Sequence, residues 1–186
     1  GDDIINAGTG IDVVTGGTGD DVFNGDGRIV TANRLEITDF EDAGDTVGDV
    51  LKLATEGSEG GGNAAGAVPT FVTVDVTLAA DTAIYRLDQE TGVNTATTDV
   101  VNLTDLNSGD GNLETDFDTG GTGAELLKLL STGSGTTASG IEMDNSQDKI
   151  YLIAYDNSAA YIYHVDGTTA DPTQVAADII PLFKLD

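Results

Sequence analysis

The chain has 186 residues and carries 7 Lys and Arg against 33 Asp and Glu, which gives a formal net charge of −26 at pH 7. This charge excludes binding of nucleic acid or anionic lipid through a basic surface. No apolar run approaches the roughly 18 residues that a membrane helix needs, so we expect no membrane insertion. The absence of Cys excludes disulfides and thiolate chemistry.

The composition indicates many turns. The chain holds 25 Gly, about twice the usual share of roughly 7%, and most of its acidic residues are Asp. Gly and Asp favour turns, whereas the abundant Thr favours strands. We therefore predict an all-β fold of short strands joined by turns. The chain begins without Met and inside a sequence repeat, so we expect it to be a piece of a longer protein.

The first 27 residues repeat with a period of nine. Each unit has the form G-G-x-G-x-D-x-U-x, where U is apolar, and Ala7 replaces the first Gly in one unit. Glycines permit the backbone angles of a tight six-residue turn, and the next three residues can form a short strand. The middle residue of each strand is expected to point inward, and these residues are Ile5, Val14 and Phe23.

This unit resembles the nonapeptide of RTX proteins, whose repeats form calcium-binding parallel β-rolls. Ca²⁺ prefers backbone carbonyl and carboxylate oxygens, which such turns supply. The resemblance implies an ion between turns two units apart, which pairs the Asp3 turn with the Asp21 turn. Asp12 then needs a partner turn before Gly1 or after Gly27. The expected metal-binding positions of the repeats are Gly1, Asp3, Gly8, Gly10, Asp12, Gly17, Gly19 and Asp21.

Residues 35–53, LEITDFEDAGDTVGDVLKL, resemble the segment that commonly follows and caps RTX rolls. The resemblance implies that Asp39 can complete a calcium site, with Asp45 as the next candidate. The spacing before the final strand is longer than in that pattern, over Thr46–Asp49.

Several segments recur in order at an offset of about 78 residues, which indicates an internal duplication. We therefore predict a short parallel β-roll at 1–27 that leads into two duplicated, sandwich-like β modules at 28–98 and 99–186, the second with a C-terminal strand. Residues 124–130 are predicted as a strand by analogy with the first copy, and 149–165 as a hairpin. The recurring segments are 21–24 with 99–102, 35–40 with 113–117, 51–53 with 127–129, and 84–88 with 162–166.

For three further features we favour a structural role over a role in binding. Residues 105–116 partly match an EF-hand loop; a polar loop is favoured, and a second calcium site around Asp105, Asn107 and Asp116 is the alternative. His164 is expected at a solvent-facing strand position. The tyrosines of the predicted hairpin favour cross-strand packing, with binding of a cell-surface polysaccharide as the alternative; they are Tyr151, Tyr155, Tyr161 and Tyr163.

The sequence predicts a calcium-folded structural domain and no enzyme. Carboxylates at this density repel one another, and Ca²⁺ binding would couple to folding. Members of the RTX family leave the cell by type I secretion, so we expect an extracellular location at a bacterial cell surface. The first hypothesis is self-association into a surface layer, fibre or adhesive sheath. The alternatives are the C-terminal secretion and folding module of an RTX exoenzyme and, more weakly, a carbohydrate-binding adhesin domain.

Overall fold

The structure is a computed structural model, which describes residues 1–25, 32–41, 48–53, 71–76, 84–90, 93, 100–106, 111–131, 137–143, 149–156, 158–167 and 173–186. The fold is mostly β-strand, with a few short helices. Two candidate residues, Asp45 and Asn107, lie outside the described residues. No helix in the described ranges is long and apolar enough to cross a membrane.

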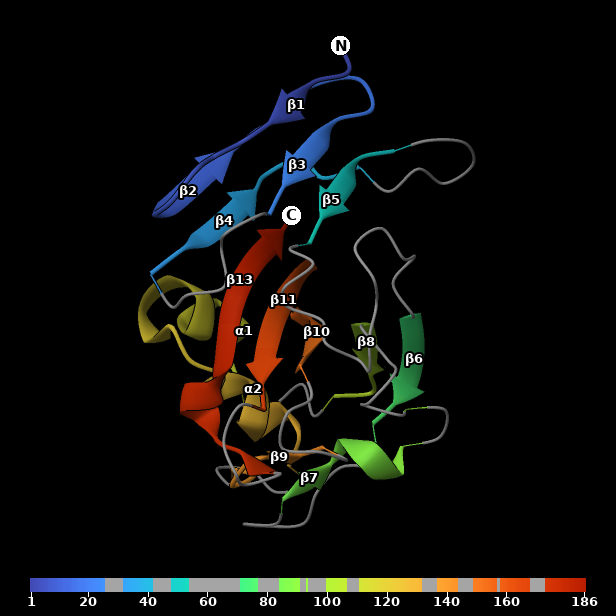
Figure 1. Ribbon diagram of the computed structural model, residues 1–186, viewed down its shortest axis with the longest axis vertical. Helices are drawn as coiled ribbons and strands as arrows, with labels where there is room; N and C mark the ends of the chain where they lie inside the picture. The colour runs from blue at the N-terminus through green and yellow to red at the C-terminus, as the bar shows by residue number, and fades with distance from the viewer. Residues whose placement is uncertain are drawn as a thin grey trace.

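The first five strands alternate between two sheets (Figure 1). Strands β1 (Ile4–Ile5), β3 (Val22–Asn24) and β5 (Val50–Lys52) form a small parallel sheet. Strands β2 (Ile11–Val14) and β4 (Arg34–Ile37) pair in parallel in the other sheet. Because the chain winds back and forth between these two sheets, we call the described residues up to 53 the N-terminal coil. The described residues from 71 onward are called the body.

The inward positions of the nine-residue unit are as predicted. Phe23 is fully buried, and Ile5 and Val14 pack against the same cluster. The residues one position earlier point outward, because side chains alternate along a strand: Ile4 is 70% and Val13 64% exposed.

The coil and the body share one large sheet. A seven-stranded sheet has the order β2-β4-β13-β11-β10-β8-β6, in which β13 pairs in parallel with β4. Figure 1 shows β13 ending beside the coil at one end of the molecule. A third, small sheet has the order β12-β9-β7. The strands of the body are β6 (Phe71–Asp75), β7 (Tyr85–Arg86), β8 (Val100–Thr104), β9 (Ile141–Glu142), β10 (Lys149–Asp156), β11 (Ala159–Asp166), β12 (Thr173–Gln174) and β13 (Ile179–Leu185).

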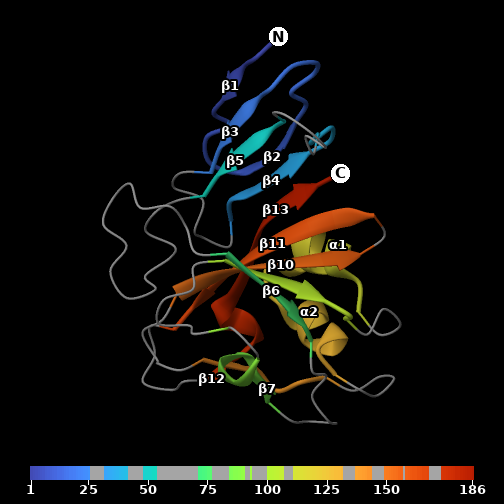
Figure 2. The ribbon, with the colours of Figure 1, turned by 90° about the vertical axis from the view of Figure 1, so that its right-hand side faces the viewer.

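Two apolar cores cover the two faces of the large sheet. Along β10, Ile150, Leu152 and Ala154 belong to one core, whereas Tyr151 and Ile153 belong to the other. The first core contains the helices α1 (Leu113–Thr115) and α2 (Ala124–Leu129), which lie on one side of the sheet (Figure 2). The second core extends into the N-terminal coil. The remaining helical turns are η2 (Leu87–Gln89), η3 (Asp116–Gly120, a π-helix) and η4 (Ala176–Asp178).

The strand prediction for 124–130 is wrong, because α2 occupies 124–129. Ala, Leu, Glu and Lys are strong helix formers. Residues 113–117 are likewise helical, whereas their sequence match at 35–40 contains strand β4. Recurring sequence therefore does not correspond to recurring structure at these places.

Strand pairing crosses both predicted domain boundaries. Strand β2 from the segment 1–27 pairs with β4 from the segment 28–98, and β4 pairs in turn with β13 from the segment 99–186. The first core packs the large sheet against helices, which differs from the sandwich predicted for the modules.

The hairpin at 149–165 is confirmed, since β10 and β11 pair over their full length. His164 is 1% exposed, and its ring centre lies 5.4 Å from that of Tyr151 in an edge-to-face arrangement. The prediction that His164 faces solvent is therefore wrong. Tyr151, Tyr161 and Tyr163 are buried, as cross-strand packing predicts, whereas Tyr155 is 52% exposed.

Candidate metal centre

The turns before β1, β3 and β5 stack on one another. The parallel register places Asp3 beside Asp21 and Asp21 beside Asp49. The Val22 N–H donates to the Asp3 carbonyl at 2.8 Å, and the Val50 N–H donates to the Asp21 carbonyl at 2.8 Å. This brings the turns of Asp3 and Asp21 together, as the resemblance to the RTX nonapeptide implies, and adds a third turn.

Side chains of the same aspartates bridge the stack. The Asp3 N–H donates to Asp21 Oδ1 at 2.7 Å, and the Asp21 N–H donates to Asp49 Oδ1 at 2.9 Å. Each carboxylate thus holds the amide of the equivalent aspartate in the neighbouring turn. The Asp20 N–H similarly donates to Asp2 Oδ1 at 3.2 Å.

Glycines make these turns sterically accessible. The second and fourth positions of two successive units have positive φ: 78° at Gly8, 116° at Gly10, 94° at Gly17 and 122° at Gly19. An L side chain is strained at such angles. Gly16 acts differently, since a Cβ there would overlap Asp21 Oδ2 and lie 3.0 Å from Asp21 Cγ. The absence of a side chain at Gly16 therefore allows the Asp21 carboxylate to pack directly against the backbone of this turn.

Asp21 is the central feature of the stack. Its side chain is 0% exposed, and Oδ1 accepts the Asp3 amide. Oδ2 is also buried and has no hydrogen-bond partner among the described residues. A buried carboxylate oxygen without a partner costs several kcal/mol unless a donor or cation reaches it, on the order of the desolvation penalty of a charged group.

The surrounding charge is negative. Hydrogen bonds link the carboxylate-bearing residues of three turns, at Asp2, Asp3, Asp20, Asp21 and Asp49. The ion pairs of the described residues all lie elsewhere, and the amino terminus donates to the Thr18 carbonyl. Such a field favours a cation, and oxygen atoms are the ligands of hard cations such as Ca²⁺.

The opposite edge of the coil shows less evidence of a site. The turn before β2 packs on the segment before β4, where the Gly10 N–H donates to Asn33 Oδ1 at 2.8 Å. Asp12 lies on β2 opposite Leu35. This pairing supplies a neighbour after Gly27 for the Asp12 unit, but the residue opposite Asp12 is Leu35 and no second aspartate.

Asp39 accepts hydrogen bonds from the turn that begins with Gly16 and Gly17. Its Oδ1 accepts from the Gly16 N–H and its Oδ2 from the Gly17 N–H, both at 2.8 Å. It therefore positions the turn before Asp21 from the other edge of the coil.

Asp49 is the site residue that sequence reasoning missed. Its Oδ1 accepts from Asp21 and its Oδ2 from the Glu41 N–H at 3.0 Å. The signal was available, because D-V-L-K at 49–52 repeats the pattern of D-V-F-N at 21–24. The resemblance to the capping segment pointed to Asp39 and Asp45 instead, and Asp49 was counted only as part of the longer spacing before the final strand.

Asp116 lies in the body and has a different role. Its carboxylate accepts from the Glu125 N–H at 2.9 Å, the Leu126 N–H at 3.0 Å and the Tyr163 hydroxyl at 3.2 Å. Burial raises the pKa of Asp116 to about 6, although these three donors favour the charged form. Asp116 thus caps the first turn of α2, and its engaged oxygens give no support to the alternative of a calcium site with Asp105.

In the part of the chain that the structure describes, no group of three or more His, Cys, Asp or Glu side chains is placed to hold a metal ion. A cation beside Asp21 would therefore depend on backbone carbonyls in addition to carboxylate. No protein-family model, curated protein or solved structure matches this chain.

Proposed function

We propose that the N-terminal coil is a short RTX-type parallel β-roll that binds Ca²⁺ at the Asp21 turn. The observation that carries this proposal is the buried Oδ2 of Asp21, which has no hydrogen-bond partner among the described residues and packs against Gly16 in the same turn. Ca²⁺ takes six to eight oxygens, commonly a mixture of carbonyls and carboxylates. One bound ion would satisfy Oδ2 and offset the repulsion among the stacked aspartates.

Calcium binding at the coil would stabilise the body as well. The Lys184 ammonium group on β13 lies 2.9 Å from Glu36 Oε1 on β4. Arg34 on β4 donates to the Asp118 carbonyl at 3.2 Å and lies 6.0 Å from the Phe117 ring centre. Because ordering of β4 positions these contacts, ion binding and folding of the whole domain are coupled. Extracellular modules bind Ca²⁺ at roughly 10⁻⁴–10⁻³ M, so the coil would become ordered, and the domain fully stable, after secretion.

We further propose that the chain self-associates through the edge strands of the coil, β1 and β2. The product would be a surface layer, fibre or sheath outside the cell. Strands β1 and β2 are the outer strands of their sheets, and edge strands can pair with further chains. Their outward side chains are apolar, with Ile4 70%, Ile11 59% and Val13 64% exposed. This combination supports a structural, assembling role.

Sedimentation velocity tests both parts of this proposal. The chain is measured in chelator, in Mg²⁺ and in Ca²⁺, each cation at about 5 mM, which exceeds the affinity range of extracellular calcium modules. We expect the body to stay folded in chelator and the coil to become compact in Ca²⁺ alone, followed by larger regular species at higher protein concentration. The double variant Ile11→Lys, Val13→Lys should compact but stay monomeric, whereas Val175→Lys, at an exposed position in the body, should assemble normally.

Absence of compaction in Ca²⁺ would contradict the calcium proposal. Compaction without assembly at any concentration would contradict self-association and leave the calcium proposal standing.

A further inference from the structure

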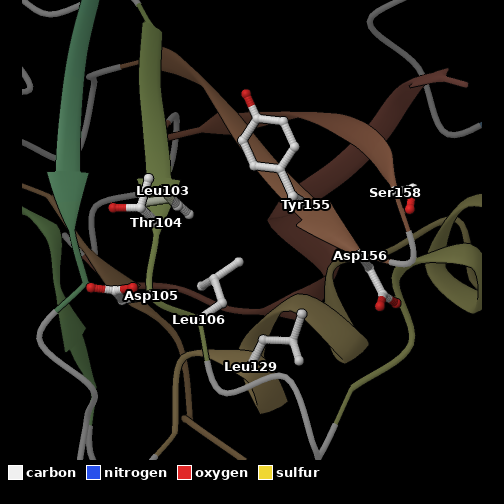
Figure 3. A pocket seen from close by; sticks show the side chains of 8 residues that line it. All are labelled: Leu103, Thr104, Asp105, Leu106, Leu129, Tyr155, Asp156 and Ser158. Carbon is white, nitrogen blue, oxygen red and sulfur yellow. The ribbon is translucent and has the colours of Figure 1, made fainter.

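A separate pocket lies in the body, between the end of β8, the β10–β11 hairpin and α2 (Figure 3). Its volume of about 370 Å³ falls within the usual range of small-molecule sites, roughly 300–1,000 Å³. The residues that line it are Leu103, Thr104, Asp105, Leu106, Leu129, Tyr155, Asp156 and Ser158.

The pocket has an aromatic side chain at its rim and leucines below it. Figure 3 shows the Tyr155 ring above Leu106 and Leu129, with its hydroxyl directed away from them. Tyr155 is 52% exposed, whereas the other three tyrosines of the hairpin are at most 2% exposed. Its ring is therefore accessible to a ligand with a flat apolar face.

Carboxylates and hydroxyls supply the polar groups. Asp105 and Asp156 lie on opposite sides of the pocket (Figure 3). Asp156 is held in place because its Oδ2 accepts from the Leu113 N–H at 3.1 Å. Ser158 adds a hydroxyl, whereas the Thr104 hydroxyl already donates to Val74 and Asp75.

This lining excludes several ligand classes. The described lining residues include no Lys, Arg or His, so an anion would meet the negative charges of Asp105 and Asp156 without a cation among them. The two carboxylates are separated by the leucine floor, which does not suit a single metal ion. A ligand that donates several hydrogen bonds to acceptors and also presents an apolar face satisfies both parts of the lining.

We propose that this pocket binds a neutral pyranose sugar. The C–H face of the ring stacks on Tyr155, and ring hydroxyls donate to the carboxylates of Asp105 and Asp156. The inference does not rest on the calcium proposal, because none of the lining residues belongs to the coil. It gives the body a ligand of its own, of the kind found in surface polysaccharides.

Saturation-transfer NMR on the full chain in Ca²⁺ tests this directly. The probes are the methyl pyranosides of glucose, galactose and mannose, with glucosamine and tetramethylammonium as cationic comparisons. We expect a neutral pyranoside to bind with a Kd of about 1 mM, corresponding to roughly −4 kcal/mol. Tyr155→Ala should weaken binding roughly tenfold or more by removing the stacking surface, whereas Tyr155→Phe should bind within about twofold to threefold.

Asp105→Asn should also weaken binding, and Val175→Ala at an exposed site elsewhere should not. The proposal is overturned if no pyranoside binds at concentrations up to about 50 mM, well above the expected Kd. It is equally overturned if Tyr155→Ala, with unchanged circular dichroism, binds as tightly as the wild type. Binding of the cationic probes alone would assign the carboxylates to cation recognition instead.

Discussion

The coil and the body each bury an aspartate, and they satisfy it in different ways. Asp116 is 1% exposed and accepts from two consecutive amides of α2 and from the Tyr163 hydroxyl. Asp21 is 0% exposed, yet its Oδ2 has no partner among the described residues. The body supplies its own donors, whereas the described residues of the coil supply none to Asp21 Oδ2. This difference is why we propose a cation for the coil and none for Asp116.

A second comparison shows a role that the two regions share. Asp39 and Asp116 both precede Phe in matching sequence segments, and each accepts from two consecutive backbone amides. Asp39 does so for a glycine turn of the coil and Asp116 for a helix. The motif therefore fixes backbone amides in both regions.

The largest effect is expected for Asp116→Ala, which leaves buried donors without an acceptor. At about 1–3 kcal/mol for each orphaned group, we expect a loss of roughly 3 kcal/mol or more in the free energy of unfolding. Urea unfolding should show this loss equally in Ca²⁺ and in chelator. Asp118→Ala, at an exposed neighbour, should change stability little. A loss confined to Ca²⁺ would mean that Asp116 serves the metal.

Gly19→Ala should be the next largest, with Gly10→Ala as its matched control. Both glycines occupy the fourth position of a unit, with φ of 122° and 116°. Backbone strain should cost each variant about 1–2 kcal/mol. A Cβ at Gly19 would also lie 2.7 Å from Gly1 C, whereas Gly10 has open space. Gly19→Ala should therefore raise the calcium midpoint of folding further than Gly10→Ala, and equal midpoints would contradict the stacked turns.

Lys184→Met tests the coupling between the regions. Lys184 lies 2.9 Å from Glu36, 3.5 Å from Glu114 and 3.3 Å from Asp186. Removing its charge leaves these carboxylates without that cation, and we expect a loss of about 1–3 kcal/mol. Calorimetry in Ca²⁺ should then resolve separate transitions of coil and body. Lys52→Met, at an exposed position of β5, is the control; two transitions in that variant as well would refute a specific role for Lys184.

A smaller effect concerns pH. Burial raises the pKa of Asp116 to about 6 from 3.8, so the folded state binds the proton more tightly than the unfolded state. This group's contribution to stability is therefore greatest below about pH 4 and decreases as pH rises towards about 6. In chelator, wild type should gain stability relative to Asp116→Asn when the pH falls from 7 to 4.5. A constant difference between the two proteins would show that Asp116 does not titrate in this range.

The local sequence pattern predicted the structure of the coil well. The nine-residue spacing determines which residues turn and which point inward, and Gly17, Gly19 and Phe23 behave accordingly. The sequence could not show that Asp21 Oδ2 would be left without a partner, since this depends on how neighbouring turns stack.

The structure of the body was predicted less well, because it depends on contacts between residues that are far apart in the sequence. The match between 51–53 and 127–129 suggested a strand, but Asp116 and the packing of α2 on the large sheet stabilise a helix there. His164 looked like a surface residue because it aligns with Arg86. It is buried against Tyr151 on the neighbouring strand. Alignment between the two copies therefore overrode signals that local helix propensity already contained.

The most direct test compares Asp21→Asn with Asp20→Asn by urea unfolding in chelator and in Ca²⁺. Both variants lose one negative charge from the same turn, but Asp20 is exposed and Asp21 is buried. Wild type and Asp20→Asn should gain about 1.4–2.7 kcal/mol at about 10 mM Ca²⁺, given a Kd of roughly 10⁻⁴–10⁻³ M. Asp21→Asn should lose most of this gain and be no less stable than Asp20→Asn in chelator. Equal calcium gains in the two variants would contradict a cation site at Asp21.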